Sequence, residues 1–193
     1  MQQALLDIPS RIETERLYLR CYAEGDGRWY YLMSQRNKAH LSRYESDNPV
    51  MAIQSEQEAE EMMRSFAIQW AERRNFFLGA FDRKSNEFAA QVYIGLVTVE
   101  LPEYQIGYFA DTAHEGHGYV SEAVKAALGF SFAHLKAHRV RLECDDTNAR
   151  SMRVAERCGM VREGHLRQNK KNRDGTLSGT MMYGILKTEL AIG

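Results

Sequence analysis

The chain has 193 residues, 44% of them hydrophobic and 26% charged, with a formal net charge of −1. This composition is typical of a globular protein with a sizeable core, and the near-neutral charge excludes a general attraction to nucleic acid or to anionic membranes. Three cysteines at unrelated spacings predict free thiols in a reducing compartment. We find no apolar run of about 18 residues and no secretion-signal pattern, so we expect a cytoplasmic protein.

Hydrophobic periodicity predicts the elements of the first half of the chain. Within residues 11–22, Leu17, Leu19 and Cys21 alternate with polar neighbours, which is the period of a half-buried strand. Helical spacing predicts two helices, the second of which begins with a Ser55-to-Glu58 capping-box interval. Alternation of apolar and polar residues then predicts three strands. In chain order these are 25–38, 54–73, 76–82, 91–100 and 104–110.

The second half repeats strands and helices at shorter intervals. Apolar residues at i, i+3 and i+4 predict a helix over 119–135. A strand and a short helix follow, the helix capped by Asn148 at its start and by Gly159 at its end. The strands are expected at 138–144, 160–168 and 179–187. The whole pattern predicts one mixed α/β domain over residues 1–193, mostly antiparallel, with a strand–helix–strand unit in its middle.

The stretch "HEGHGYVS" (114–121) places two glycines directly before the 119–135 helix. Glycine keeps side chains away from the backbone, and the first amides of a helix have no partner within the helix and attract anions. Gly116, Gly118 and the Ser121 hydroxyl are therefore candidates for binding a phosphate group. A tight turn without a ligand is the alternative that these residues leave open.

Several further motifs occur in a fixed order along the chain. They are "TERLYLR" (14–20), "IGY" (106–108), "GHGYVSEA" (116–123), "NARS" (148–151) and "GMVREG" (159–164). Together they resemble the GNAT superfamily of acetyl-CoA-dependent N-acetyltransferases, and within it the RimJ/RimL branch of ribosomal-protein N-terminal acetyltransferases. The resemblance covers residues 11–189. It implies an α/β (α+β) GNAT fold, with a sheet of about six or seven strands and about four flanking helices.

The resemblance also implies where acetyl-CoA would bind. Two central strands, 104–110 and 138–144, would splay apart, and the pantetheine arm would lie between them like an added strand. Glu115 and Val120 depart from the family's usual Gln or Arg and its small residue, which predicts weaker coenzyme affinity. The implied coenzyme-binding residues are Phe109, Ala110, Glu115, Gly116, His117, Gly118, Tyr119, Val120, Ser121 and Asn148.

Amide formation requires removal of a proton from the amine and protonation or stabilisation of the departing thiolate. At the position where many superfamily members carry an acidic tyrosine the chain has Ala155, so the resemblance implies Ser151 as the catalytic hydroxyl. A simple helix cap at Asn148 and a local hydrogen bond at Ser151 are the alternatives. The base stays open between Glu100, Tyr108, His165 and an ordered water.

The resemblance implies acetyl transfer to a primary amine within a ternary complex, with a protein N-terminus as the expected acceptor. Two alternatives remain: the same reaction on a small amine, such as an aminoglycoside, a polyamine or an amino-acid-like metabolite, and a non-catalytic module that binds acetyl-CoA. We expect no nucleic-acid or membrane partner. The histidine pairs lack a third ligand, so no metal is expected. The sequence leaves a homodimer open.

Overall fold

The structure is a computed structural model that describes residues 7–46, 48–172 and 174–190. Its elements are β1 (Arg11–Glu13), β2 (Leu17–Cys21), α1 (Gly27–Leu41), η2 (Pro49–Ala52), α2 (Glu56–Ala71), β3 (Asn75–Asp82), β4 (Phe88–Thr98), β5 (Glu103–Ala110), η3 (Thr112–His114), α3 (Tyr119–Ala133), β6 (Arg139–Asp145), α4 (Ala149–Arg157), β7 (Val161–Lys171), β8 (Leu177–Leu186) and η4 (Lys187–Glu189).

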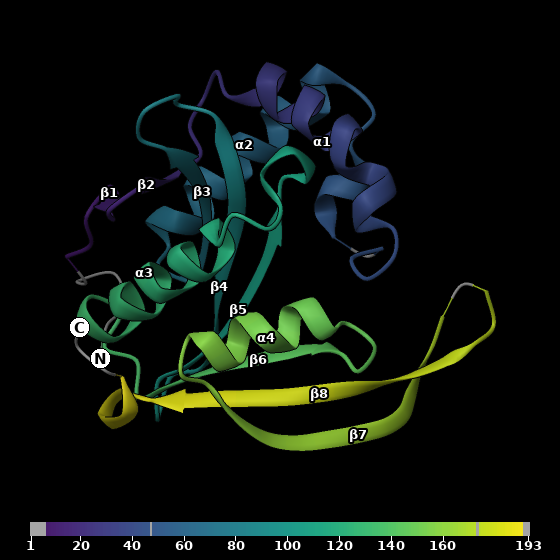
Figure 1. Ribbon diagram of the computed structural model, residues 1–193. Coiled ribbons are helices and arrows are strands. Elements are labelled where there is room, and N and C mark those ends of the chain that lie inside the picture. The colour runs from purple at the N-terminus through teal and green to yellow at the C-terminus, as the bar shows by residue number, and fades with distance from the viewer. Residues whose placement is uncertain (1–6, 47, 173, 191–193) are drawn as a thin grey trace.

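Eight strands form one sheet in the order β1-β2-β3-β4-β5-β6-β8-β7 (Figure 1). Six of the neighbouring pairs are antiparallel, and β5–β6 is the parallel pair. The expected mixed, mostly antiparallel fold is therefore confirmed. The sheet has more strands than expected because residues 11–22 form two strands, and Thr14 N donates to Leu17 O at 2.9 Å where the chain reverses.

Helices cover both faces of the sheet, as the alternation of side chains requires. On β2, Leu17 and Leu19 are fully buried in a core that also contains residues of α3. Tyr18, between them, belongs to a second core with residues of α1 and α2. Figure 1 shows α3 and α4 in front of the sheet and α2 behind it. No helix within the described residues is long and apolar enough to cross a membrane.

The parallel pair β5–β6 separates after a short stretch. It is in register only at Glu103–Arg139, Tyr104–Val140 and Gln105–Arg141. Beyond these positions β5 continues to Ala110 and β6 to Asp145 without pairing to each other, and Figure 1 shows the strands diverging. The expected splay is thus confirmed. It leaves edge groups of both strands without a strand partner on that side.

The helix ends follow the expected capping rules. Asn148 Oδ1 accepts from Ser151 N at 3.1 Å at the start of α4, and Gly159 after its end adopts φ of +80°. Ser55 Oγ accepts from Glu58 N at 3.1 Å. The other half of that capping box differs, because the Glu58 side chain accepts from the amide of Gln54, the residue before the cap. These caps set where α2 and α4 begin.

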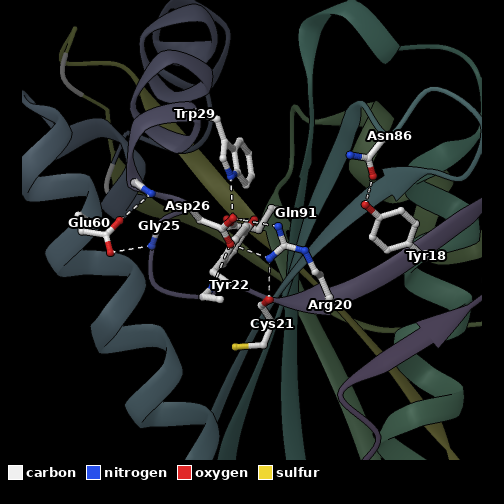
Figure 2. Close-up of polar contacts among 12 residues, drawn as sticks. Tyr18, Arg20, Cys21, Tyr22, Gly25, Asp26, Trp29, Glu60, Asn86 and Gln91 are labelled. Carbon is white, nitrogen blue, oxygen red and sulfur yellow. Dashed lines mark hydrogen bonds and ion pairs between the residues drawn. The ribbon is translucent and has the colours of Figure 1, made fainter.

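Asp26 fixes the start of α1 over the sheet, although its side chain does not cap the helix. Its carboxylate accepts two hydrogen bonds from the Arg20 guanidinium, at 2.6 and 2.9 Å, and one from Trp29 Nε1 at 2.9 Å (Figure 2). Glu60 of α2 accepts from the amides of Gly25 and Gly27 at 2.8 and 2.9 Å. The β2–α1 turn is therefore tied to both the sheet and α2.

Two of the sequence motifs meet at Glu122, in the first turn of α3. Its carboxylate accepts from Thr14 Oγ1 at 2.6 Å, Arg16 N at 2.9 Å and Arg16 Nε at 2.6 Å. Arg16 Nη1 also donates to His117 O at 2.9 Å. Partial burial alone would raise the pKa of Glu122, but the hydrogen bonds from Thr14 and Arg16 hold that pKa below its usual range. The "TER" turn thereby anchors the loop and the helix entrance that follow β5.

We predict that Glu122→Gln lowers the free energy of unfolding by about 2 kcal/mol at neutral pH, since it weakens hydrogen bonds to a charged acceptor. A lowered folded pKa stabilises the native state above the unfolded glutamate pKa of about 4.3, and this stabilisation is lost as pH falls through the folded pKa. Urea unfolding at several pH values measures this. Glu61→Gln on the exposed face of α2 is the control, and an equal loss in both variants would contradict the prediction.

Candidate active site

A cavity of about 440 Å³ lies between the N-terminal ends of α3 and α4 and the end of α1. Six of the residues expected at the site line it: Phe109, Ala110, Glu115, Val120, Asn148 and Ser151. Because the first amides of a helix lack partners within it, the entrance of α3 presents N–H groups to this region. At the entrance of α4, Ala149 N donates to Thr147 O and Ser151 N to Asn148 Oδ1, both at 3.1 Å. An elongated anionic ligand would find helix dipoles of favourable sign here.

A second cavity, of about 500 Å³, lies along the splay between β4, β5 and β6. Polar residues of these strands and of α2 line it, including Gln69, Gln91, Tyr93, Gln105 and Glu143. The two cavities share six lining residues, namely Tyr44, Glu45, Tyr108, Phe109, Asn148 and Ser151. A group bound in one cavity can therefore meet a group bound in the other beside Tyr108 and Ser151.

The glycines before α3 occupy backbone conformations that disfavour other residues. Gly116 and Gly118 both have φ of +78°, the left-handed region. A Cβ at Gly116 would meet open space, so its requirement is conformational, and a Cβ at Gly118 would reach Arg16 Nη2 at 3.6 Å. Because glycine has no side chain, the turn does not cover the helix-entrance amides at these two positions.

Three other expected coenzyme contacts have side chains or carbonyls engaged elsewhere. The Tyr119 hydroxyl donates to Asp82 Oδ2 at 2.8 Å, His117 O accepts from Arg16, and Ser121 O accepts from Cys158 Sγ at 3.4 Å. None of these three residues lines the first cavity. Their backbone amides remain as routes to a ligand, as do the exposed ring of His117 and the hydroxyl of Ser121.

Glu115 spans the mouth of the first cavity. Its Oε1 lies 2.6 Å from Arg150 Nη1 of α4 and 3.4 Å from His40 Nε2 of α1. The Arg150 side chain is 73% exposed, so the pair is solvent-screened and contributes little to stability. The sequence suggested that this carboxylate would repel a phosphate. The structure shows that it also forms an ion pair with the guanidinium of Arg150.

Tyr108 and Ser151 form the polar centre that both cavities share. The Ser151 hydroxyl lies 3.2 Å from the Tyr108 hydroxyl, which in turn donates to Ser151 O at 2.9 Å. Burial raises the pKa of Tyr108 well above its usual value, although the Ser151 hydroxyl partly offsets the effect. A phenol with a raised pKa stays protonated, so Tyr108 is poorly suited to removing a proton and can act as a hydrogen-bond donor.

The other two base candidates lie away from both cavities. Glu100 is in the turn between β4 and β5, at the end where β5 and β6 are still paired. His165 lies on the exposed strand β7, and its Nε2 is 2.8 Å from Asp146 Oδ2. Neither residue lines a cavity. Sequence reasoning missed Glu45, His40 and Gln91, which belong to no motif and reach the site only through the fold. It also gave no role to Arg150, although this residue lies within the "NARS" motif.

Within the described residues, no group of three or more His, Cys, Asp or Glu side chains is placed to hold a metal ion. Acetyl-CoA, an anionic thioester, fits the site better. The phosphate end would meet the glycine turn and the two helix entrances, and the thioester would reach the shared residues at the splay.

Comparison with known proteins identifies the family of this chain. The Acetyltransferase (GNAT) domain family matches residues 16–161, most of the chain. The chain belongs to this family. It is therefore a GNAT-type N-acetyltransferase that uses acetyl-CoA.

Individual relatives vary in how much they cover. "Probable N-acetyltransferase YjcK" of Bacillus subtilis is 44% identical over 66 residues, a stretch that spans 34% of this chain and 36% of that protein. A spermidine N(1)-acetyltransferase of Vibrio cholerae is 29% identical over 160 residues, or 78% and 82% of the two chains. The solved structure of RimL, a ribosomal L7/L12 alpha-N-protein acetyltransferase in complex with coenzyme A, superposes with a TM-score of 0.80 at 20% identity, covering 93% and 97%. At that identity the superposition shows the fold.

We predict that Glu115→Gln tightens acetyl-CoA binding severalfold, because it removes a negative charge and frees Arg150 for the pyrophosphate. Calorimetric titration at two salt concentrations measures this, and the gain should shrink at high salt. Glu87→Gln, which removes an exposed carboxylate outside both cavities, is the control. Unchanged or weaker binding by Glu115→Gln would show that the Glu115 bridge supports the site.

Proposed function

We propose that this protein transfers the acetyl group of acetyl-CoA directly to the α-amine of a protein or peptide N-terminus, in the manner of the RimJ/RimL branch. The observation that carries the proposal is the row of uncharged amide and phenol side chains in the second cavity, which lie beside its charged residues Glu45, Glu143, Asp145 and Lys170. Gln69, Asn75, Gln91, Tyr93 and Gln105 all lie along it. Amide and phenol groups pair with the N–H and C=O groups of a peptide backbone without a charged partner.

Gln91 is the best organised of these side chains. It is buried, and its Oε1 accepts from the hydroxyl of Tyr22 (Figure 2) and from that of Tyr30, both at 2.8 Å. With its oxygen held by two donors, the amide nitrogen of Gln91 is the part left to donate to a ligand. A fixed donor in the acceptor cavity suits the carbonyl oxygen of a peptide's first residue.

The carboxylates of the second cavity argue against a polycation. Asp145 accepts from Ser178 Oγ and Thr147 Oγ1, both at 2.6 Å, and from Thr147 N at 2.9 Å. Glu143 lies 3.9 Å from Arg141, and the cavity also contains Lys170. Two of the three carboxylates in this cavity thus have partners, whereas binding a polyamine requires free carboxylates.

A small amine is the second candidate. The similarity to the spermidine N(1)-acetyltransferase favours it, as does Glu45, a third carboxylate in the second cavity. An aminoglycoside or an amino-acid-like metabolite would use the same group. Both candidates require the same coenzyme geometry and differ only in what fills the second cavity.

On the coenzyme side, we infer that the amides from Gly116 to Ser121 bind the pyrophosphate and that the pantetheine arm pairs with the free edge of β5. Amides near Phe109 and Ala110 then polarise the thioester carbonyl, and a donor of this kind contributes roughly 3 kcal/mol in other oxyanion sites. Asn148, besides capping α4, faces the same arm. We propose that the Ser151 hydroxyl, supported by Tyr108, protonates the departing thiolate.

Direct transfer is supported by the state of the cysteines. Cys144 and Cys158 are buried, and burial raises the pKa of Cys158 to about 11. A thiol that stays protonated is a poor acyl carrier. We further propose that residues 1–193 act as one domain, since all described strands share one sheet. We also propose that this domain acts in the cytoplasm. A homodimer stays a prediction.

The experiment that tests the acceptor is coenzyme A thiol release from acetyl-CoA with two acceptor pools. One pool contains short peptides with free Ala, Ser or Met N-termini, and the other contains polyamines, aminoglycosides and free amino acids. We expect turnover with the peptides. Turnover confined to the small amines would replace the first candidate with the second.

We predict that Ser151→Ala lowers kcat by about 100-fold, the scale typical of a lost proton donor, with little change in the KM for acetyl-CoA. Tyr108→Phe should lower kcat as well, and the double variant should cost less than the product of the two. Tyr44→Phe is the matched control, because its hydroxyl bonds only to Thr147 O, at 3.2 Å, among the described residues. Wild-type kcat in Ser151→Ala would remove Ser151 from the mechanism.

A further inference from the structure

Glu45 lies where the coenzyme and acceptor cavities meet. It follows α1, and its amide donates to Leu41 O at 2.7 Å, so the segment is held against the end of that helix. Its side chain lines both cavities together with Tyr108 and Ser151. Among the carboxylates of the described residues, Glu45 is the one that lines both.

The carboxylate of Glu45 has few partners of its own. In the described part of the chain, it accepts one long hydrogen bond, from Asn48 Nδ2 at 3.4 Å. Asp145 and Glu143, by contrast, are held by hydrogen bonds or an arginine. A partly buried carboxylate without strong partners retains lone pairs that can accept a proton from a ligand.

The electrostatic surroundings of Glu45 suit proton removal near neutral pH. Burial raises the pKa of Glu45, and Asn48 and Lys170 offset part of the rise. A base whose pKa lies nearer the working pH combines availability with affinity for the proton. The other titratable or charged groups that line the two cavities are His40, Arg43, Tyr44, Tyr93, Tyr108, Glu115, Glu143, Cys144, Asp145, Arg150 and Lys170.

We propose that Glu45 is the general base that deprotonates the acceptor amine. This inference rests on the proposed function only in requiring a primary amine in the second cavity, whatever its source. Glu45 takes the role of base for which the sequence offered Glu100 and His165, both of which lie outside the two cavities. Tyr108 and Ser151 then act on the leaving thiolate.

The step balances as follows in protons and bonds. The acceptor ammonium gives one proton to the Glu45 carboxylate, and the free amine attacks the thioester carbonyl to form the C–N bond. The C–S bond breaks, and the Ser151 hydroxyl, held beside Tyr108, gives its proton to the thiolate. The second proton of the nitrogen replaces the proton that Ser151 has given, so this proton ends in the thiol. Glu45 releases its proton to solvent, so the products are the amide, coenzyme A and one proton.

The test compares Glu45→Gln with Glu72→Gln, a control at an exposed carboxylate that lines neither cavity. The assay uses acetyl-CoA with whichever acceptor the wild-type protein turns over fastest. We expect Glu45→Gln to lower kcat by about 100-fold or more, with the KM for acetyl-CoA within about twofold of the wild type. Glu72→Gln should retain wild-type activity, and Glu45→Asp should recover part of the loss.

The pH profile separates proton removal from a structural role. Wild-type kcat/KM should fall on the acid side as Glu45 becomes protonated, and that acid limb should be missing from the residual activity of Glu45→Gln. A kcat in Glu45→Gln within about twofold of wild type, or an unchanged acid limb, would overturn the proposal. A preference for small amines would contradict only the proposed acceptor, and the Glu45 comparison would then use the small amine.

Discussion

The separation of β5 from β6 is the constraint on which the site depends. A parallel pair that stayed in register to Ala110 would close the space where the two cavities meet. The pair is stable at its start because β4 and β8 flank it and because buried Tyr104 and Val140 fix the register there. Beyond Gln105, α4 and the end of α1 occupy the rim of the gap. The sheet therefore stays continuous at one end and opens at the other.

Charge is distributed unevenly around this opening. The helix entrances and Arg150 make the first cavity suitable for an anion, and Glu115 offsets that character at the mouth. The second cavity is lined by neutral amides, by Lys170 and by three carboxylates, of which Asp145 is held by hydrogen bonds. Between them, Glu45 and the pair Tyr108–Ser151 have opposite tendencies: the carboxylate can take a proton, and the hydroxyls can give one. This polarity fits a reaction in which an amine enters from one side and a thiolate leaves on the other.

Much of the fold could be predicted from the sequence because its signals are local. The alternation at Leu17 and Leu19, the Asn148 cap and the left-handed glycines at 116, 118 and 159 each depend on neighbouring residues. The split of 11–22 was missed because the reversal at Thr14 contains no glycine or proline. Glu45 and Gln91 could not be found from local patterns: they reach the site only because α1 and β4 are brought together by tertiary contacts such as Tyr30–Gln91. The proposed base could therefore be identified only from the tertiary structure of the cavity.

The most direct test of the account is amide hydrogen exchange with and without acetyl-CoA, read at individual residues. If the pantetheine arm lies in the splay and the pyrophosphate at the helix entrance, exchange should slow at residues 107–110 and 116–121. It should stay unchanged at residues 103–105, where β5 already pairs with β6. Protection confined to β7 and β8, or no change at either stretch despite measured binding, would contradict the placement of the coenzyme.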